Sequence, residues 1–447
     1  MLPHSAGADN AEFHALASGS VATTDNETGS ATNPRGSVFS DVRPGMLFTY
    51  NAPRNIHELM TEVAFLYHFG RSKPNVTFRA DWKAFFLPSP RSDMTVGATA
   101  SSGQLHALSA SSVPDETPLL VTPEGRVNNS NVAASQNLSY IASEFSRVWQ
   151  RGFARYSTTD DTVTLFTTEG FEAGAAVGFD RRMRMHNFVF EVGGSFLRFE
   201  RLDPMMVQMG DRLDRQLNPR AVFVWQWDID KKWSTNVDAG VVYVNPVGID
   251  PYNPTEEREA APFPVFGALA AYTDVWGRAQ AQARRAVTPN LLIAQNTISD
   301  SVNVTFALPL AFLDKDSSRR RPRVVGIGTL GADRTQLIDP VTSTLEGEFK
   351  VVRLDLSVGW QPRPGQTLGL RYQFSYQDGD TVAEMVVPSF YRNTFYFTFA
   401  LRWPEDIQVR VPRRGQSVRA DRTDLAPIGA EPVIIDPSEL FEEGDGR

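Results

Sequence analysis

Two groups of residues are of types that could support cofactor or metal chemistry. Gly326, Gly328 and Gly331 match the G-x-G-x-x-G pattern of dinucleotide-binding turns. That site needs a helix after the third glycine, but the residues that follow have no apolar stripe and include Pro340. The six histidines do not have the spacing of metal ligands. We therefore expect a protein that is not an enzyme, with no catalytic residue, no cofactor and no metal site.

A third group consists of charged residues that alternate with apolar ones. In residues 76–84, Arg79, Asp81 and Lys83 occupy one face and apolar side chains such as Phe78 occupy the other. Charges on one face of a strand are costly in a dry core unless they are paired, whereas a polar lumen accommodates them. We expect these residues to line a lumen: Arg79, Asp81, Lys83, Glu191, Asp228, Asp238, Arg278, Arg353, Asp355, Arg371 and Arg402.

The segments that carry these residues have the period-2 pattern of β-strands. In residues 350–360, for example, Leu354, Leu356 and Val358 alternate with polar residues. Many of the segments are roughly 9–13 residues long, close to the length with which a tilted strand crosses a bilayer. We predict fourteen strands, with twelve or sixteen as alternatives, at 44–51, 57–70, 75–86, 136–156, 162–168, 171–180, 187–201, 220–229, 233–244, 275–286, 291–312, 348–361, 367–378 and 392–403.

The connections between these strands fall into two classes. The short turns are at 70–75, 180–186, 230–232, 285–290 and 361–366, and the long loops are at 88–135, 202–219, 245–274, 313–347 and 379–391. Short turns at one end and long loops at the other are typical of transmembrane β-barrels. We expect the turns near Ser72 and Pro364 to face the periplasm, and residues 88–135 and 314–347 to face outside the cell.

Four tryptophans fall at strand ends beside short turns, or at the end of the last strand: Trp227, Trp233, Trp360 and Trp403. Aromatic residues gather in this way at a membrane interface, so we expect these four to form an aromatic girdle. With this pattern and the aromatic last strand 395–403, residues 44–403 resemble bacterial outer-membrane β-barrels of the porin and transporter class. The resemblance implies an all-β transmembrane antiparallel barrel in the outer membrane, in contact with its lipid.

Composition agrees with this fold class and excludes several others. The chain has 447 residues, no cysteine and a net charge of −8, which argues against disulfide or thiol chemistry and against nucleic-acid binding. No apolar run reaches the length of a membrane-spanning helix. We expect three regions: a flexible N-terminal segment or lumen plug at 1–42, the barrel at 43–403, and a charged, proline-containing periplasmic tail at 404–447.

Two functions fit these expectations. The first is a channel or passive transporter for small polar or amphipathic solutes, with a lumen of mixed charge. The alternative is a structural or assembly barrel with a filled lumen that anchors an envelope or surface complex. The apolar residues Val433, Ile434 and Ile435 in the tail suggest a periplasmic or envelope partner for residues 425–447.

Overall fold

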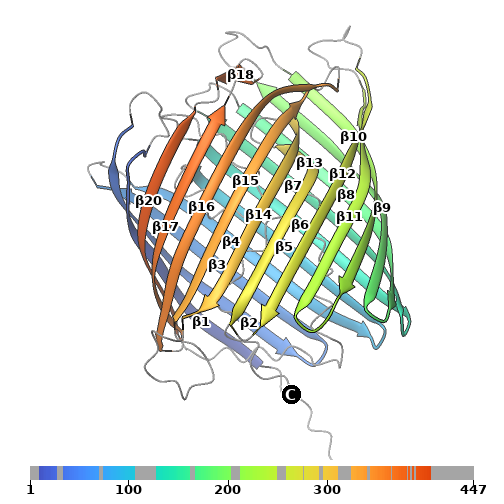
Figure 1. The fold of residues 1–447 in the computed structure, drawn as a ribbon, viewed down its shortest axis with the longest axis horizontal. Helices are drawn as coiled ribbons and strands as arrows, with labels where there is room; N and C mark the ends of the chain where they lie inside the picture. Colours follow the sequence, from blue (N-terminus) through green and yellow to red (C-terminus); the bar gives the residue numbers. More distant parts are fainter. Residues whose placement is uncertain are drawn as a thin grey trace, which may run out of the picture.

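The computed structural model is a closed antiparallel β-barrel of eighteen strands, β1 to β17 and β20 (Figure 1). The short strands β18 and β19 pair only with each other. Among the described residues, no helix is long and apolar enough to cross a membrane. The structure describes residues 10–27, 34–69, 74–105, 127–161, 167–202, 212–248, 258–274, 276–290, 295–310, 324–339, 343–363, 365–379, 381–382, 385–386 and 389–403.

Each strand of the barrel pairs with the strands before and after it in the sequence. The ring closes where β1 pairs with β20, with Ala15 opposite Trp403. The strands are β1 Asn10–Thr24, β2 Ser37–Ala52, β3 Asn55–His68, β4 Asn75–Ser89, β5 Ser92–Leu105, β6 Val127–Ser143, β7 Ser146–Asp161, β8 Thr167–Met183, β9 His186–Leu202, β10 Arg212–Asp228, β11 Trp233–Pro246, β12 Ala261–Asp274, β13 Gly277–Asn290, β14 Gln295–Pro309, β15 Val324–Ile338, β16 Leu345–Arg363, β17 Gln366–Gly379, β18 Thr381–Val382, β19 Met385–Val386 and β20 Phe390–Trp403.

The outer face is apolar and exposed, while charged side chains are buried on the inner face. On β14, Val302, Val304 and Phe306 are between 39% and 53% exposed. On the inner face, Glu191 and Asp214 are each 2% exposed. A water-soluble protein has the opposite arrangement of apolar and polar faces. A membrane barrel needs the arrangement seen here, because hydrocarbon surrounds the wall and polar groups meet inside it.

The prediction of about fourteen strands is wrong, because the barrel has eighteen. β1, β5, β12 and β15 lie in segments expected to be a tail or loops. The predicted strand 136–156 is two strands, β6 and β7, and β8 begins only at Thr167, near the end of the predicted strand 162–168.

The missed strands have weak hydrophobic periodicity for a physical reason. The outer face of β15 includes Gly326 and Gly328, and the outer face of β12 includes Pro262 and Pro264. The outer face of a wall in lipid must lack polar groups. It does not also require large side chains. Small outward residues therefore complete the barrel without giving a strong alternation in the sequence.

The N-terminal region differs from the expected flexible segment or plug. Within residues 1–42, residues 10–24 form β1 and residues 37–42 begin β2, so the described part of this region belongs to the barrel wall. Residues 1–9 and 28–33, and the predicted tail 404–447, lie outside the described residues.

The barrel has one rim of mostly short turns and one rim of mostly longer loops. At the short-turn rim the connections are 53–54, 90–91, 144–145, 184–185, 229–232, 275–276, 310–323 and 364–365. β1 begins and β20 ends at this same rim. The long-loop rim has the connections 25–36, 69–74, 106–126, 162–166, 203–211, 247–260, 291–294, 339–344 and 380–389.

The strand count also corrects the expected sides of several connections. The connection that contains Ser72 joins β3 to β4 and lies at the rim opposite the one that contains Pro364, although both were expected at the periplasmic side. The loop 310–323 shares the rim of Pro364, although residues 314–347 were expected at the other side. A strand that is missed reverses the direction of everything after it, so these errors follow from the count.

Candidate functional site

The predicted lumen residues all lie on the inner side of the wall. Their positions alternate with exposed apolar residues of the same strands, as Arg371 does with Leu370 and Tyr372 on β17. They come from eight strands around the ring, which are β4 for Arg79, Asp81 and Lys83, β9 for Glu191, β10 for Asp228, β11 for Asp238, β13 for Arg278, β16 for Arg353 and Asp355, β17 for Arg371, and β20 for Arg402.

Several of these charges are neutralised by neighbours on the wall. Arg79 donates to Asp81 over 2.6 Å between Nε and Oδ2. Arg371 donates to Asp355 over 2.8 Å, and Gln373 donates to the same carboxylate over 2.9 Å. Most of these groups keep contact with solvent, and the Arg371 side chain is 35% exposed. The inner wall therefore presents paired charges of both signs to the space inside.

A second charged cluster, whose two glutamates are expected on the lumen face but whose arginines are not, joins β7, β8, β9 and β10. Arg151 and Arg220 both donate to Oε1 of Glu191, over 2.5 and 2.7 Å. Arg155 pairs with Glu172 over 2.6 Å. We call these five residues the arginine network. The alternation of Arg147, Trp149, Arg151, Phe153 and Arg155 is a sequence signal for it, within the predicted strand 136–156.

Two aromatic side chains of β7, Trp149 and Phe153, lie against the inner wall. A Cβ atom at Gly178 would be 2.1 Å from the Trp149 ring, and one at Gly174 would be 2.6 Å from the Phe153 ring. Each ring therefore occupies space that a larger residue on β8 would fill. The Arg151 guanidinium lies 5.5 Å from the centre of the Trp149 ring, so the network and the rings form one layer along the wall.

The end of β13 and the start of β14, residues 286–290 and 295–298, lie inside the barrel, where Thr297 and Ile298 remain paired with β15. Both faces of this segment are buried: in turn along the chain, Val287 and Thr288 are 7% exposed, and Thr297 and Ile298 are 0% and 1% exposed. In the wall, one face of each strand is exposed. We call this segment the inner hairpin; its described residues are 286–290 and 295–298.

Packing and pairing agree with this position. β12 pairs with β13 only as far as Phe266 opposite Arg285, although β12 extends to Ala261. Val287 and Ile298 belong to one apolar cluster with residues of the inner wall. The wall residues of this cluster on β9 to β12 are Val189, Val222, Val224, Val242, Val244, Phe263 and Val265.

Hydrogen bonds fix the inner hairpin to distant strands. The Asn296 side chain donates to Gln216 Oε1 on β10, and Gln216 donates to Asp214 over 2.7 Å. Asp214 also pairs with Arg258 over 2.8 Å. On another side, Arg155 of β7 donates to the carbonyl oxygen of Pro289 over 3.3 Å. β7 and β13 are not neighbours in the ring, so the hairpin narrows the lumen near the long-loop rim.

The four tryptophans of the predicted girdle lie near strand ends at the short-turn rim. Trp233 is the first residue of β11 and Trp403 is the last of β20, while Trp227 and Trp360 lie close to the ends of β10 and β16. Trp403 is 68% exposed.

The turn between β10 and β11 lies at the same rim. Asp230 accepts hydrogen bonds from the backbone N–H groups of Trp233 and Lys232, over 2.7 and 2.6 Å, and these bonds lower the pKa of Asp230.

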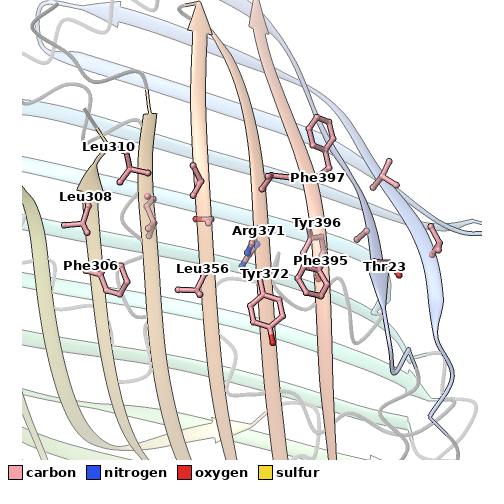
Figure 2. A pocket seen from close by; sticks show the side chains of 18 residues that line it. Thr23, Phe306, Leu308, Leu310, Leu356, Arg371, Tyr372, Phe395, Tyr396 and Phe397 are labelled. Carbon is pink, nitrogen blue, oxygen red and sulfur yellow. The ribbon is translucent and has the colours of Figure 1, made fainter. Parts of the chain in front are cut away.

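A groove of about 710 Å³ runs along the outside of the wall from β14 to β2 (Figure 2). Phe306, Leu356 and Phe395 belong to its apolar lining, and Arg371 and Tyr396 alternate with the outward residues of the same strands. Within the described part of the chain, no group of three or more His, Asp or Glu side chains is placed to hold a metal ion.

A closed barrel with an apolar outside and a polar inside is the architecture of proteins of the bacterial outer membrane. The chain is such an outer-membrane β-barrel, and lipid contacts its outer face.

Comparison with known proteins shows a similarity of fold alone. No family model matches the chain, and no curated protein matches it. The alcaligin outer-membrane receptor FauA from Bordetella pertussis is 9% identical, with 88% of this chain and 76% of that chain covered and a TM-score of 0.43. OpdK from Pseudomonas aeruginosa is 9% identical, with coverage of 88% and 99% and a TM-score of 0.42. OccK3 (OpdO) from the same species is 10% identical, with coverage of 88% and 96% and a TM-score of 0.45.

Proposed function

We propose that the protein is a channel through which small polar solutes cross the outer membrane passively. The observation that carries this proposal is the inner wall, where charged groups such as Asp355 and Arg371 are paired yet stay in contact with solvent. A wall of this kind keeps water inside the barrel and offers polar partners to a passing solute.

The balance of charges argues for weak discrimination between anions and cations. Arg79 is paired with Asp81, Arg353 with Asp333, and Arg371 with Asp355. Because each pair presents little net charge, we expect the size of the solute to matter more than its sign. The inner hairpin is the element that reduces the cross-section, so it should set that size limit.

Liposome swelling tests this function directly. We expect proteoliposomes to swell in isosmotic solutions of small sugars, at a rate that falls as the sugar becomes larger. Proteoliposomes that contain heat-unfolded protein provide the background rate. Swelling no faster than this background for every sugar would contradict the proposal and favour the filled, structural barrel. The arginine network and the inner hairpin are the features that support that alternative.

The proposal also includes a partner for the C-terminal tail. β20 ends at the short-turn rim, and residues 404–447 follow it in the sequence. A polar segment with one apolar patch, here Val433, Ile434 and Ile435, has the composition of a short binding motif. A chain that lacks residues 425–447 should insert normally but lose a periplasmic or envelope protein on purification. The same set of co-purified proteins with and without these residues would contradict this part.

A further inference from the structure

Three prolines lie in the parts of β12 and β13 where the two strands are no longer paired. β12 contains Pro262 and Pro264, and β13 contains Pro289. All three lie beyond the last pair between these strands, Phe266 opposite Arg285. Proline has no backbone N–H, so it cannot donate to a neighbouring strand.

The direction of the N–H groups on β12 shows which neighbour the prolines affect. The N–H of Thr273 donates to Lys232, which leads into β11. N–H groups alternate in direction along an antiparallel strand, so odd-numbered residues of β12 point to β11 and even-numbered residues point to β13. Pro262 and Pro264 are therefore missing donors toward β13, whereas pairing with β11 continues to Ala261.

The same register identifies the partners that a continued β13 would bring. If pairing went on beyond Phe266 and Arg285, Pro264 would face Val287 and Pro262 would face Pro289. These two pairs need four N–H donors, and only Val287 can supply one. A wall position for this half of β13 would therefore leave its carbonyl groups and those of β12 largely without partners, which is costly.

Single prolines elsewhere in the barrel do not have this effect. On β10, pairing with β11 is interrupted at Pro219 and resumes at Arg220 opposite Val242. On β2, pairing with β3 is interrupted at Pro44 and resumes at Gly45 opposite Glu62. Where β13 separates from β12, by contrast, the three prolines occupy consecutive hydrogen-bonding positions.

We propose that Pro262, Pro264 and Pro289 hold the inner hairpin inside the barrel by removing its alternative partner in the wall, and that they thereby fix the size limit of the channel. The second half of this inference rests on the proposed function. The apolar cluster around Val287 and the bond from Asn296 to Gln216 stabilise the inner position. The prolines determine the choice between the inner position and the wall.

A single introduced cysteine can show whether the inner hairpin lies inside the barrel or in the wall, because the natural chain has no cysteine. Ile298 is 1% exposed in the inner position, and its place in the β14 alternation would turn it outward if the hairpin joined the wall. In an Ile298→Cys background, the triple variant Pro262→Thr, Pro264→Thr, Pro289→Thr should react with a thiol reagent at least about fivefold faster, the effect of about one regained hydrogen bond. The control Pro219→Thr should leave the rate unchanged.

Two further measurements keep the test decisive. Leu345→Cys, at an exposed site, should react equally in all backgrounds and confirms reagent access. If the triple variant does not give the heat-modifiable folded form, Pro264→Thr alone should give a smaller increase in rate. Unchanged reactivity of Ile298→Cys in every folded proline variant would overturn the inference.

Solute passage then separates this inference from the proposed function. We expect proteoliposomes with the triple variant to admit sugars that are excluded by the natural chain. Faster cysteine reaction without passage of any sugar, in either protein, would contradict the channel and leave the role of the prolines in place. Faster reaction with an unchanged size limit would contradict the hairpin as the element that sets it.

Discussion

The direction of each side chain decides which solvent it meets, and neighbouring residues of one strand meet different solvents. On β15, Leu330 is 53% exposed on the outer face. Thr329 points inward, opposite Asp355 of β16. Leu330→Arg should lower the free energy of unfolding by about 2–4 kcal/mol, because it places a cation against hydrocarbon near the middle of the strand.

Thr329→Arg is the matched control for this substitution. The new guanidinium would lie in the polar interior beside Asp355, so we expect a much smaller loss of stability. Urea unfolding in lipid vesicles measures both variants. Equal stabilities would mean that the alternation assigned to β15 is wrong.

The turn at Asp230 gives a pH dependence with a defined sign. Its pKa is lowered in the folded barrel by the hydrogen bonds from Trp233 and Lys232. A lowered carboxyl pKa contributes stability above the ordinary Asp value of about 4, and this contribution is lost as the pH falls through the lowered value. Asp230→Ala should therefore lower the urea midpoint at pH 7.

The difference in midpoint between the natural chain and Asp230→Ala should shrink as the pH is taken below about 4. Titration of the urea midpoint from pH 7 downward checks this. A difference that stays constant over the whole range would show that the carboxylate charge has no part in the turn.

Between strands, the arginine network is a buried polar link on the inner wall. Glu191 is 2% exposed and accepts from both Arg151 and Arg220, which come from β7 and β10. Glu191→Gln removes the charge that compensates two guanidinium groups, so we expect a loss of about 3–5 kcal/mol. Glu200→Gln breaks a pair with Arg198, whose side chain is 47% exposed, and should cost less than about 1 kcal/mol.

Urea unfolding of the two variants in the same vesicles compares the two links directly. A cost for Glu191→Gln as small as that for Glu200→Gln would show that water reaches Glu191 freely.

Strand by strand, the sequence predicts those elements whose outer residues are large. In β16, Leu354, Leu356 and Val358 alternate with polar residues, and the segment was recognised. β15 has glycine at two outward positions, and β12 has proline, so periodicity alone could not reveal them. The expected set of eleven lumen residues depends on charge, which is a clear signal at any position of a strand.

The inner hairpin could not be predicted from the same pattern. Its residues, such as Val287 and Ile298, are apolar in the way that lipid-facing residues are, and nothing local distinguishes the two environments. The information lies in the prolines of two different strands, and it becomes readable only when the register between β12 and β13 is known.

For the whole molecule, the strand count determines which connections share a rim. With eighteen strands, the chain enters and leaves the barrel at the short-turn rim, where the four tryptophans also lie. The inner hairpin and most of the longer loops belong to the opposite end. The barrel is therefore asymmetric along its axis, and the narrow part of the lumen lies near the long-loop rim.

If the barrel is a channel, a water-filled passage remains beside the inner hairpin and the arginine network. Single-channel recording in planar lipid bilayers tests it most directly, with the natural chain and the triple proline variant measured under the same salt. We expect discrete conductance steps for the natural chain and larger steps for the triple variant. Bilayers that contain folded protein but stay silent with both chains would contradict it.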